Sequence, residues 1–209
     1  MRIDPLKLDG SYLVTPKIHP DDRGSFLELF NGPAFEAAVG HPLVVRQANC
    51  TSTRRDAIRG IHAFALPPSQ ARYVACPRGA VSAVVVDTRT GSPTFGESVP
   101  VELDDQGRQA LYVAEGLGLA YMPTSEDATV VYLCSSTYAP QREILVNPLD
   151  PDLELPWPRD REYVLSAKDR AAPTLREAEK AGLLPDYAAC QEWYARLREP
   201  GAGRDDTHD

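Results

Sequence analysis

A long run of short β-strand candidates, between about residues 12 and 146, constrains the fold of this chain more than any other feature. The candidates are rich in valine, tyrosine and phenylalanine, and turns containing glycine, proline or aspartate separate them. Many short strands at this spacing are typical of a sandwich or jelly roll, and not of a parallel α/β sheet. We expect one helix near 33–39 and strands at 25–30, 43–49, 58–65, 72–76, 80–88, 98–103, 109–114, 117–122, 128–134 and 143–146.

The chain changes character after Asn147, where a proline-rich connection leaves the strand region. Thr174 and Glu177 have the spacing of a capping box, which predicts a helix that starts there and stops at Gly182. A second helix is expected over residues 186–197. Its apolar side chains recur at helical spacing and predict a face packed against the strands: Tyr187, Cys190, Trp193 and Leu197.

Length and charge limit the class of protein. The 209 residues fit a single domain over 1–200, followed by a tail over 201–209 that is expected to be disordered. The net charge of −8 argues against a nucleic-acid binder. The N-terminus lacks the apolar core of a signal peptide, and no apolar run reaches the roughly 20 residues of a membrane helix. We therefore expect a cytoplasmic protein with no membrane partner.

Metal-ligand spacing is missing from the sequence. The cysteines form no CxxC pair, and the four histidines form no HxH pair, so neither a disulfide framework nor a metal site is indicated. The sequence therefore disfavours a metal-dependent cupin enzyme. Arginines outnumber lysines eighteen to four, so arginine is the expected partner of any phosphate group.

His62 is the histidine most suited to chemistry, because it lies inside the strand candidate 58–65. A neutral histidine with a carboxylate partner is a good general base near pH 7. A satisfied core histidine is the alternative that the pattern leaves open. Arg59 stands three positions away, so a straight strand would place the two side chains on opposite faces. Gly60 permits a bulge that could bring both to one site.

Several motifs occur in one order along most of the chain. They are DRGSF at 22–26, QAN at 47–49, RGIH at 59–62, PPSQAR at 67–72, VDTRTGSPTFG at 86–96 and SAKD at 166–169, with Tyr132, Tyr138, Glu143, DP at 150–151 and WP at 157–158. With these motifs the chain resembles the dTDP-4-dehydrorhamnose 3,5-epimerase family, including its relatives from antibiotic-sugar pathways. The resemblance runs from about residue 16 to 187.

This resemblance implies a mostly β, cupin-type jelly-roll barrel with C-terminal helices. It also implies a homodimer without metal or organic cofactor, acting on a dTDP-linked 4-keto-6-deoxy sugar. In such a sugar the ketone at C4 acidifies the protons at C3 and C5. A base removes one proton to give an enolate, and reprotonation from the opposite face inverts that carbon.

The resemblance also assigns roles by position. His62 matches the base, Asp169 the carboxylate that orients it, and Tyr132 the acid that returns a proton. Arg72 stands where the family usually has lysine, near the developing enolate oxygen. Positions that hold the nucleotide diphosphate or otherwise contact substrate are matched by Arg23, Gln47, Asn49, Arg59, Glu28, Tyr138, Glu143 and Lys168. Arg23 is expected to reach the neighbouring subunit's site.

The sequence departs from the family pattern close to the sugar. Leu119 stands where the family has a second active-site histidine, and Ala63-Phe64 replaces a tyrosine-glutamine pair. Leu119 offers only an apolar wall, and we expect inversion at one carbon, with C5 ahead of C3. A nucleotide-sugar binding protein with reduced or lost catalysis is the alternative that Leu119 keeps open.

Overall fold

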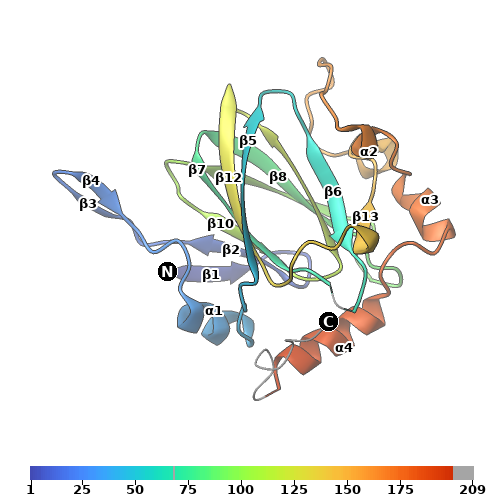
Figure 1. The fold of residues 1–209 in the computed structure, drawn as a ribbon, viewed down its shortest axis with the longest axis horizontal. Coiled ribbons are helices and arrows are strands. Elements are labelled where there is room, and N and C mark those ends of the chain that lie inside the picture. Colours follow the sequence, from blue (N-terminus) through green and yellow to red (C-terminus); the bar gives the residue numbers. More distant parts are fainter. Residues whose placement is uncertain (68, 200–209) are drawn as a thin grey trace.

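The computed structural model describes residues 1–67 and 69–199; the tail expected over 201–209 lies outside these residues. Two antiparallel sheets face each other and form a barrel (Figure 1). The six-stranded sheet has the order β1-β2-β10-β7-β12-β5, and the five-stranded sheet has the order β13-β6-β11-β8-β9. The strands of the two sheets are β1 (Arg2–Pro5), β2 (Ser11–Thr15), β5 (Gln47–Arg54), β6 (Arg59–Phe64), β7 (Arg72–Arg78), β8 (Ala80–Asp87), β9 (Ser98–Asp104), β10 (Ala110–Val113), β11 (Leu117–Pro123), β12 (Asp127–Cys134) and β13 (Glu143–Leu145).

The chain changes sheet at most connections. From β5 to β8, and again from β9 to β13, consecutive strands lie in opposite sheets. Strands far apart in sequence therefore become neighbours, such as β5 with β12 and β2 with β10. This antiparallel arrangement is the expected jelly roll.

Three apolar clusters hold the layers together. The central cluster fills the space between the sheets and includes Val74, Val85, Leu111 and Val130. A second cluster lies under the helices α1 (Gly32–Val39) and α4 (Tyr187–Leu197), which cover the outer face of the six-stranded sheet. The third joins the five-stranded sheet to the segment that follows β13. The C-terminal helices are therefore packed onto the barrel through the two outer clusters.

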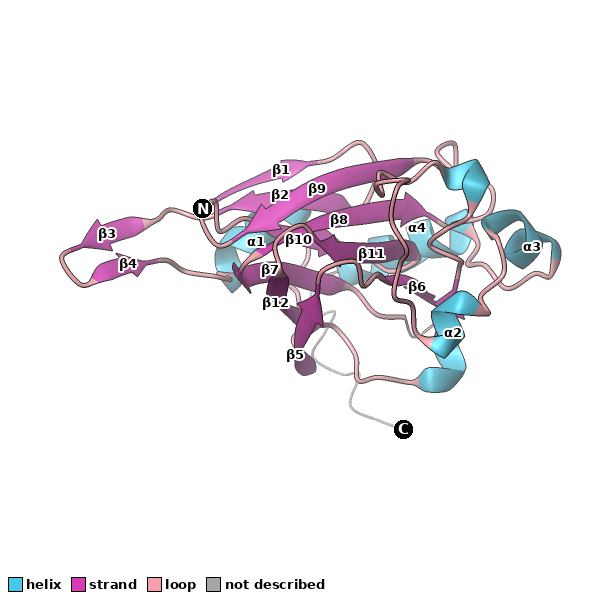
Figure 2. Cartoon of the chain, turned by 90° about the horizontal axis from the view of Figure 1, so that it is seen from above, coloured by secondary structure: helices cyan, strands magenta, loops and turns pink. Residues whose placement is uncertain are grey.

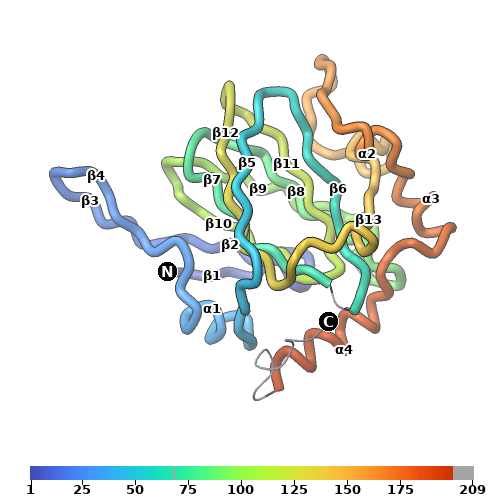
Figure 3. The backbone as a smooth tube through the Cα atoms, viewed as in Figure 1, coloured from blue at the N-terminus to red at the C-terminus, as the bar shows by residue number. Residues whose placement is uncertain are grey.

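The C-terminal segment runs along the outside of the barrel from α2 (Ala167–Arg170) through α3 (Leu175–Lys180) to α4 (Figure 3). Short 3-10 turns at η1 (Pro140–Arg142) and η2 (Pro151–Leu153) precede it. Thr174 and Glu177 form the predicted capping box of α3. Of the expected packing face of α4, Cys190 is buried and Trp193 packs half-buried against the same cluster, whereas the second buried residue, Tyr194, was not expected. Helix α2, which holds the candidate site residues Lys168 and Asp169, was not expected from the sequence.

A two-stranded hairpin of β3 (His19–Asp21) and β4 (Gly24–Phe26) projects away from the barrel (Figure 2). The strand expected over 25–30 therefore stops early, because the chain leads to Asn31, which caps α1. The strand expected over 43–49 starts only at Gln47, since its partner β12 ends at the residue opposite, Cys134. Among the described residues, no helix has the length and apolarity needed to cross a membrane.

Candidate active site

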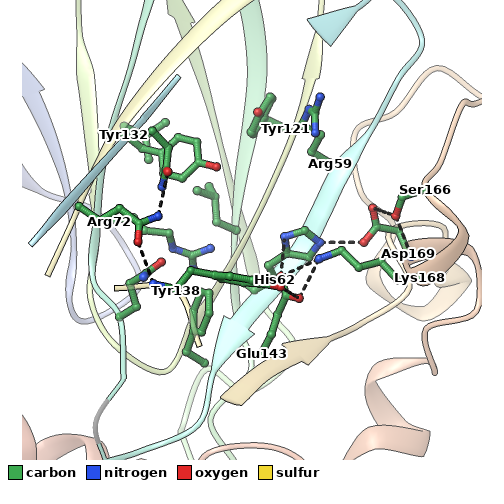
Figure 4. A pocket seen from close by; sticks show the side chains of 16 residues that line it. Arg59, His62, Arg72, Tyr121, Tyr132, Tyr138, Glu143, Ser166, Lys168 and Asp169 are labelled. Carbon is green, nitrogen blue, oxygen red and sulfur yellow. Dashed lines mark hydrogen bonds and ion pairs between the residues drawn. The ribbon is translucent and has the colours of Figure 1, made fainter. Parts of the chain in front are cut away.

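A cavity of about 360 Å³ lies between the two sheets and α2 (Figure 4). Inward-pointing residues of β5, β7 and β12 line one wall, and residues of β6, β11 and β13 line the other. The structure brings eleven of the thirteen candidate site residues together here: Gln47, Asn49, Arg59, His62, Arg72, Leu119, Tyr132, Tyr138, Glu143, Lys168 and Asp169.

His62 and Asp169 form a dyad at the side of the cavity. His62 Nε2 lies 2.7 Å from Asp169 Oδ1, across 107 positions of sequence. Ser166 caps α2, accepting a hydrogen bond from the Asp169 backbone N–H at 3.1 Å and donating to Asp169 Oδ2 at 2.7 Å. Burial opposes ionisation of Asp169, but the hydrogen bonds with His62 and Ser166 outweigh it and lower its pKa. The dyad is thus an anionic carboxylate facing an imidazole.

The other ring nitrogen of His62 faces a second set of polar side chains. Its Nδ1 lies 3.6 Å from Glu143 Oε1, beyond ordinary hydrogen-bond length. Lys168 Nζ donates to both oxygens of Glu143, at 2.9 and 2.7 Å, and Tyr138 donates to Oε2 at 3.0 Å. Because Asp169 accepts the Nε2 proton, the lone pair of a neutral His62 lies on Nδ1.

Arg72 and Tyr132 lie on the sheet opposite His62. Arg72 Nη2 donates to the carbonyls of His62 and Leu117, at 3.0 and 3.1 Å. Burial lowers the pKa of Arg72 to about 10, so it remains a cation at neutral pH. Burial raises the pKa of the Tyr132 phenol, although the positive charges of Arg72 and Arg59 oppose the shift. The phenol is therefore protonated at neutral pH. A base and a proton donor therefore face one cavity from opposite sheets.

Arg59 and His62 both line the cavity although three positions separate them. The pairing of β6 with β11 shifts register between the Leu119–His62 and Tyr121–Arg59 pairs, where Gly60 lies. Gly60 has φ +113°, and a Cβ there would lie 2.4 Å from Leu119 O. The irregularity that Gly60 permits is present, and it turns Arg59 to the same cavity as His62.

Two candidates, Arg23 and Glu28, do not line the cavity of this chain. Arg23 lies at the turn of the projecting hairpin with a 90% exposed side chain, paired with Asp21 at 2.6 Å. Glu28 accepts a hydrogen bond from Asn31 at 3.1 Å.

The cavity also contains residues that were not expected from the sequence: Phe64, Gln70, Val74, Tyr121 and Ser166. Strand alternation could have found three of them, because Phe64, Val74 and Tyr121 each lie two positions after an expected site residue. Ser166 carried the weaker signal of a helix cap.

Within 1–67 and 69–199, no group of three or more His, Cys, Asp or Glu side chains is placed to hold a metal ion. A metal-dependent cupin enzyme therefore has no ligand set in this part of the chain.

The family model described as dTDP-4-dehydrorhamnose 3,5-epimerase matches residues 5–177. The chain belongs to this family. A dTDP-4-dehydrorhamnose 3,5-epimerase of Mycolicibacterium smegmatis is 48% identical over 92% of the chain and 95% of the relative. A dTDP-4-dehydro-6-deoxyglucose 3-epimerase of Streptomyces bikiniensis is 51% identical over 90% of the chain and 96% of the relative.

Solved structures of the family have the same fold. The 3'-monoepimerase ChmJ of Streptomyces bikiniensis, in complex with dTDP-quinovose, superposes with a TM-score of 0.91 at 50% identity, over 93% of this chain and 98% of ChmJ. The rmlC epimerase of Mycobacterium tuberculosis superposes with a TM-score of 0.92 at 43% identity, over 95% of this chain and 100% of that chain. The expected family, jelly-roll fold and epimerase class are therefore confirmed.

Proposed function

We propose that this chain epimerises a dTDP-linked 4-keto-6-deoxy sugar, at C5, C3 or both, by moving a proton through an enolate. The observation that carries the mechanism is the placement of His62 and Tyr132 on opposite sheets of one cavity. A proton removed on one side of the sugar ring and returned on the other inverts the carbon between them.

In the proposed reaction His62 Nδ1 removes the proton next to the ketone. Asp169 holds the ring through Nε2 and stabilises the imidazolium that forms. Arg72 supplies positive charge where the enolate oxygen develops. Tyr132 then donates its phenol proton from the opposite sheet, and solvent restores both groups.

The nucleotide end of the substrate is assigned to Gln47, Asn49 and Arg59. Their amide and guanidinium groups line the cavity on β5 and at the start of β6. Arg23, on its projecting hairpin, is assigned to the site of a second subunit in a homodimer. Glu28, Tyr138, Glu143 and Lys168 are assigned to further substrate contacts. The proposed compartment is the cytoplasm.

A dTDP-sugar binding protein with reduced or lost catalysis is the second candidate. The observation that favours it is Leu119, paired directly opposite His62, where it places an apolar side chain beside the base.

Proton exchange separates the two candidates. The protein is incubated with dTDP-4-keto-6-deoxyglucose in heavy water, and NMR follows deuterium at C3 and C5 separately. Enzyme-dependent exchange at either carbon supports the epimerase, and we expect it at one carbon, with C5 ahead of C3. Binding of dTDP without exchange at either carbon would identify a binding protein, and no binding of dTDP would refute both candidates.

A further inference from the structure

The end of the cavity around Arg59 contains a phenol that the proposed mechanism does not use. Strand β11 pairs Leu119 with His62 and Tyr121 with Arg59. Successive inward positions of one strand thus place an apolar side chain beside the base and a hydroxyl group beside the arginine. Figure 4 shows Tyr121 in the part of the cavity wall next to Arg59.

Tyr121 is held by a threonine of the opposite sheet. Its hydroxyl lies 2.7 Å from Thr51 Oγ1. The other acceptor within reach of Thr51, the carbonyl of Val130, lies at the longer distance of 3.4 Å. Thr51 can therefore donate its proton to the Tyr121 oxygen, which leaves the phenol proton free for a ligand.

The charge around Tyr121 is positive and unbalanced. Arg59 Nε donates to Thr53 Oγ1 at 2.9 Å, and within the described residues Arg59 forms no ion pair with a carboxylate. Burial raises the pKa of Tyr121, with the hydrogen bond to Thr51 and the field of Arg59 opposing the shift, so the phenol is a neutral donor at pH 7. A guanidinium with no carboxylate partner among the described residues, beside a neutral hydroxyl donor, matches anionic oxygens of a phosphate group.

We infer that Tyr121 is a substrate-binding residue whose hydroxyl, oriented by Thr51, donates to a diphosphate oxygen of the nucleotide held by Arg59. The inference rests on the proposed function and deepens it, since it adds a neutral donor to the arginine at the diphosphate. It also divides β11 by role, with Leu119 facing the sugar and Tyr121 facing the diphosphate.

The test compares Tyr121→Phe with the wild type by calorimetric titration of dTDP. A hydrogen bond to a charged oxygen is lost, so we expect dTDP to bind roughly 10- to 100-fold more weakly. Proton exchange at saturating sugar nucleotide should keep its rate, because the hydroxyl acts in binding. Thr51→Val, which removes the orienting hydroxyl, should weaken dTDP binding in the same direction by a smaller factor.

Tyr163→Phe is the matched control, since the Tyr163 hydroxyl donates to the carbonyl of Pro158 outside the cavity. Unchanged dTDP affinity in this control and weakened affinity in Tyr121→Phe support the inference. Equal dTDP affinity in Tyr121→Phe and the wild type overturns it, as does a lower exchange rate at saturation with unchanged affinity. A wild type that binds no dTDP overturns the proposed function itself, and this inference with it.

Discussion

Asp169 determines which nitrogen of His62 can act as a base. Its carboxylate accepts the Nε2 proton, and its own position is set by Ser166 at the N-terminus of α2. The nitrogen left with a lone pair, Nδ1, faces Glu143, whose charge is shared with Lys168. The protein therefore fixes both the tautomer and the orientation of the imidazole before a substrate binds.

We expect His62→Ala and Asp169→Ala each to lose most epimerisation while dTDP binding stays nearly intact. Removal of a general base typically lowers the rate by about 10²- to 10⁴-fold, and proton transfer contributes nothing to nucleotide affinity. Exchange kinetics and dTDP titration measure the two effects. Either variant turning over at a rate near that of the wild type would refute the assignment.

Leu119 is the residue whose change should alter the outcome of the reaction. It is 6% exposed and lies opposite His62, so a sugar oxygen beside it has no hydrogen-bond donor on that side. We expect the wild type to exchange at one carbon. Leu119→His should raise activity on 4-keto-6-deoxyglucose, by roughly 10-fold or more if the new donor reaches the oxyanion, or extend exchange to the second carbon. Rapid, comparable exchange at C3 and C5 in the wild type would contradict this role.

At the scale of elements, the register shift between β6 and β11 is what brings Arg59 and His62 to one cavity. Gly60 permits it through a positive φ and a close approach to the backbone of Leu119 and Ala120.

Gly60→Ala should therefore destabilise the protein by more than the left-handed backbone conformation alone explains. Gly91→Ala is the matched control, because Gly91 has φ +79° but open space around its Cα. The conformational penalty of an L residue at such an angle is about 1–2 kcal/mol, and the clash at Gly60 adds to it. Urea unfolding compares the two variants. Equal losses would show that the close approach does not matter.

Helix α4 packs over a buried carboxyl group in the turn between β10 and β11. Glu115 is 3% exposed; its Oε1 accepts from Ser135 at 3.2 Å, and its Oε2 has no partner among the described residues. Burial raises its pKa above the ordinary value of 4.5. The folded protein thus retains a proton on Glu115 that the unfolded chain releases, so the contribution of Glu115 to stability falls as pH rises above 4.5.

Glu115→Gln removes this proton linkage. We expect its stability relative to the wild type to increase between pH 4.5 and 7.5, measured by chemical denaturation. Glu102→Gln, on the exposed face of β9, is the matched control with no such trend expected. A difference between Glu115→Gln and wild type that is constant over this range would contradict the linkage.

Most strands and the site-bearing motifs could be predicted from the sequence, because alternation and turn residues are local signals. Strand β1 was missed because Arg2, Asp4 and Pro5 make a polar edge strand that lacks alternation. The approach of Asp169 to His62 could not follow from spacing, since tertiary packing of α2 creates it. Alternation from Leu119 could have placed Tyr121 on the cavity face of β11, but its position beside Arg59 follows only from the register of β6 with β11.

At the scale of the whole molecule, the projecting hairpin carries Arg23 away from the cavity of its own chain. In the proposed homodimer, Arg23 would reach the site of the second subunit. We expect a dimer in sedimentation equilibrium, and Arg23→Ala should weaken dTDP binding without unfolding the barrel.

Mixed dimers test whether Arg23 acts across the interface. At a substrate concentration low enough for the weakened binding of Arg23→Ala to limit its rate, Arg23→Ala and His62→Ala chains should recover up to about a quarter of wild-type activity after random mixing. Half of the dimers then carry one intact site. No recovery in confirmed mixed dimers would place Arg23 and His62 in the same subunit's site.

The two members of the dyad are separated by 107 positions. A ribosome adding roughly 5–20 residues per second needs roughly 5–20 s to go from the base to its carboxylate partner. During this time the emerging chain already carries His62 but has nothing to orient it. If His62 and Asp169 act as proposed, each new molecule becomes competent for proton transfer only late in its synthesis, when the segment after β13 has left the exit tunnel and docked.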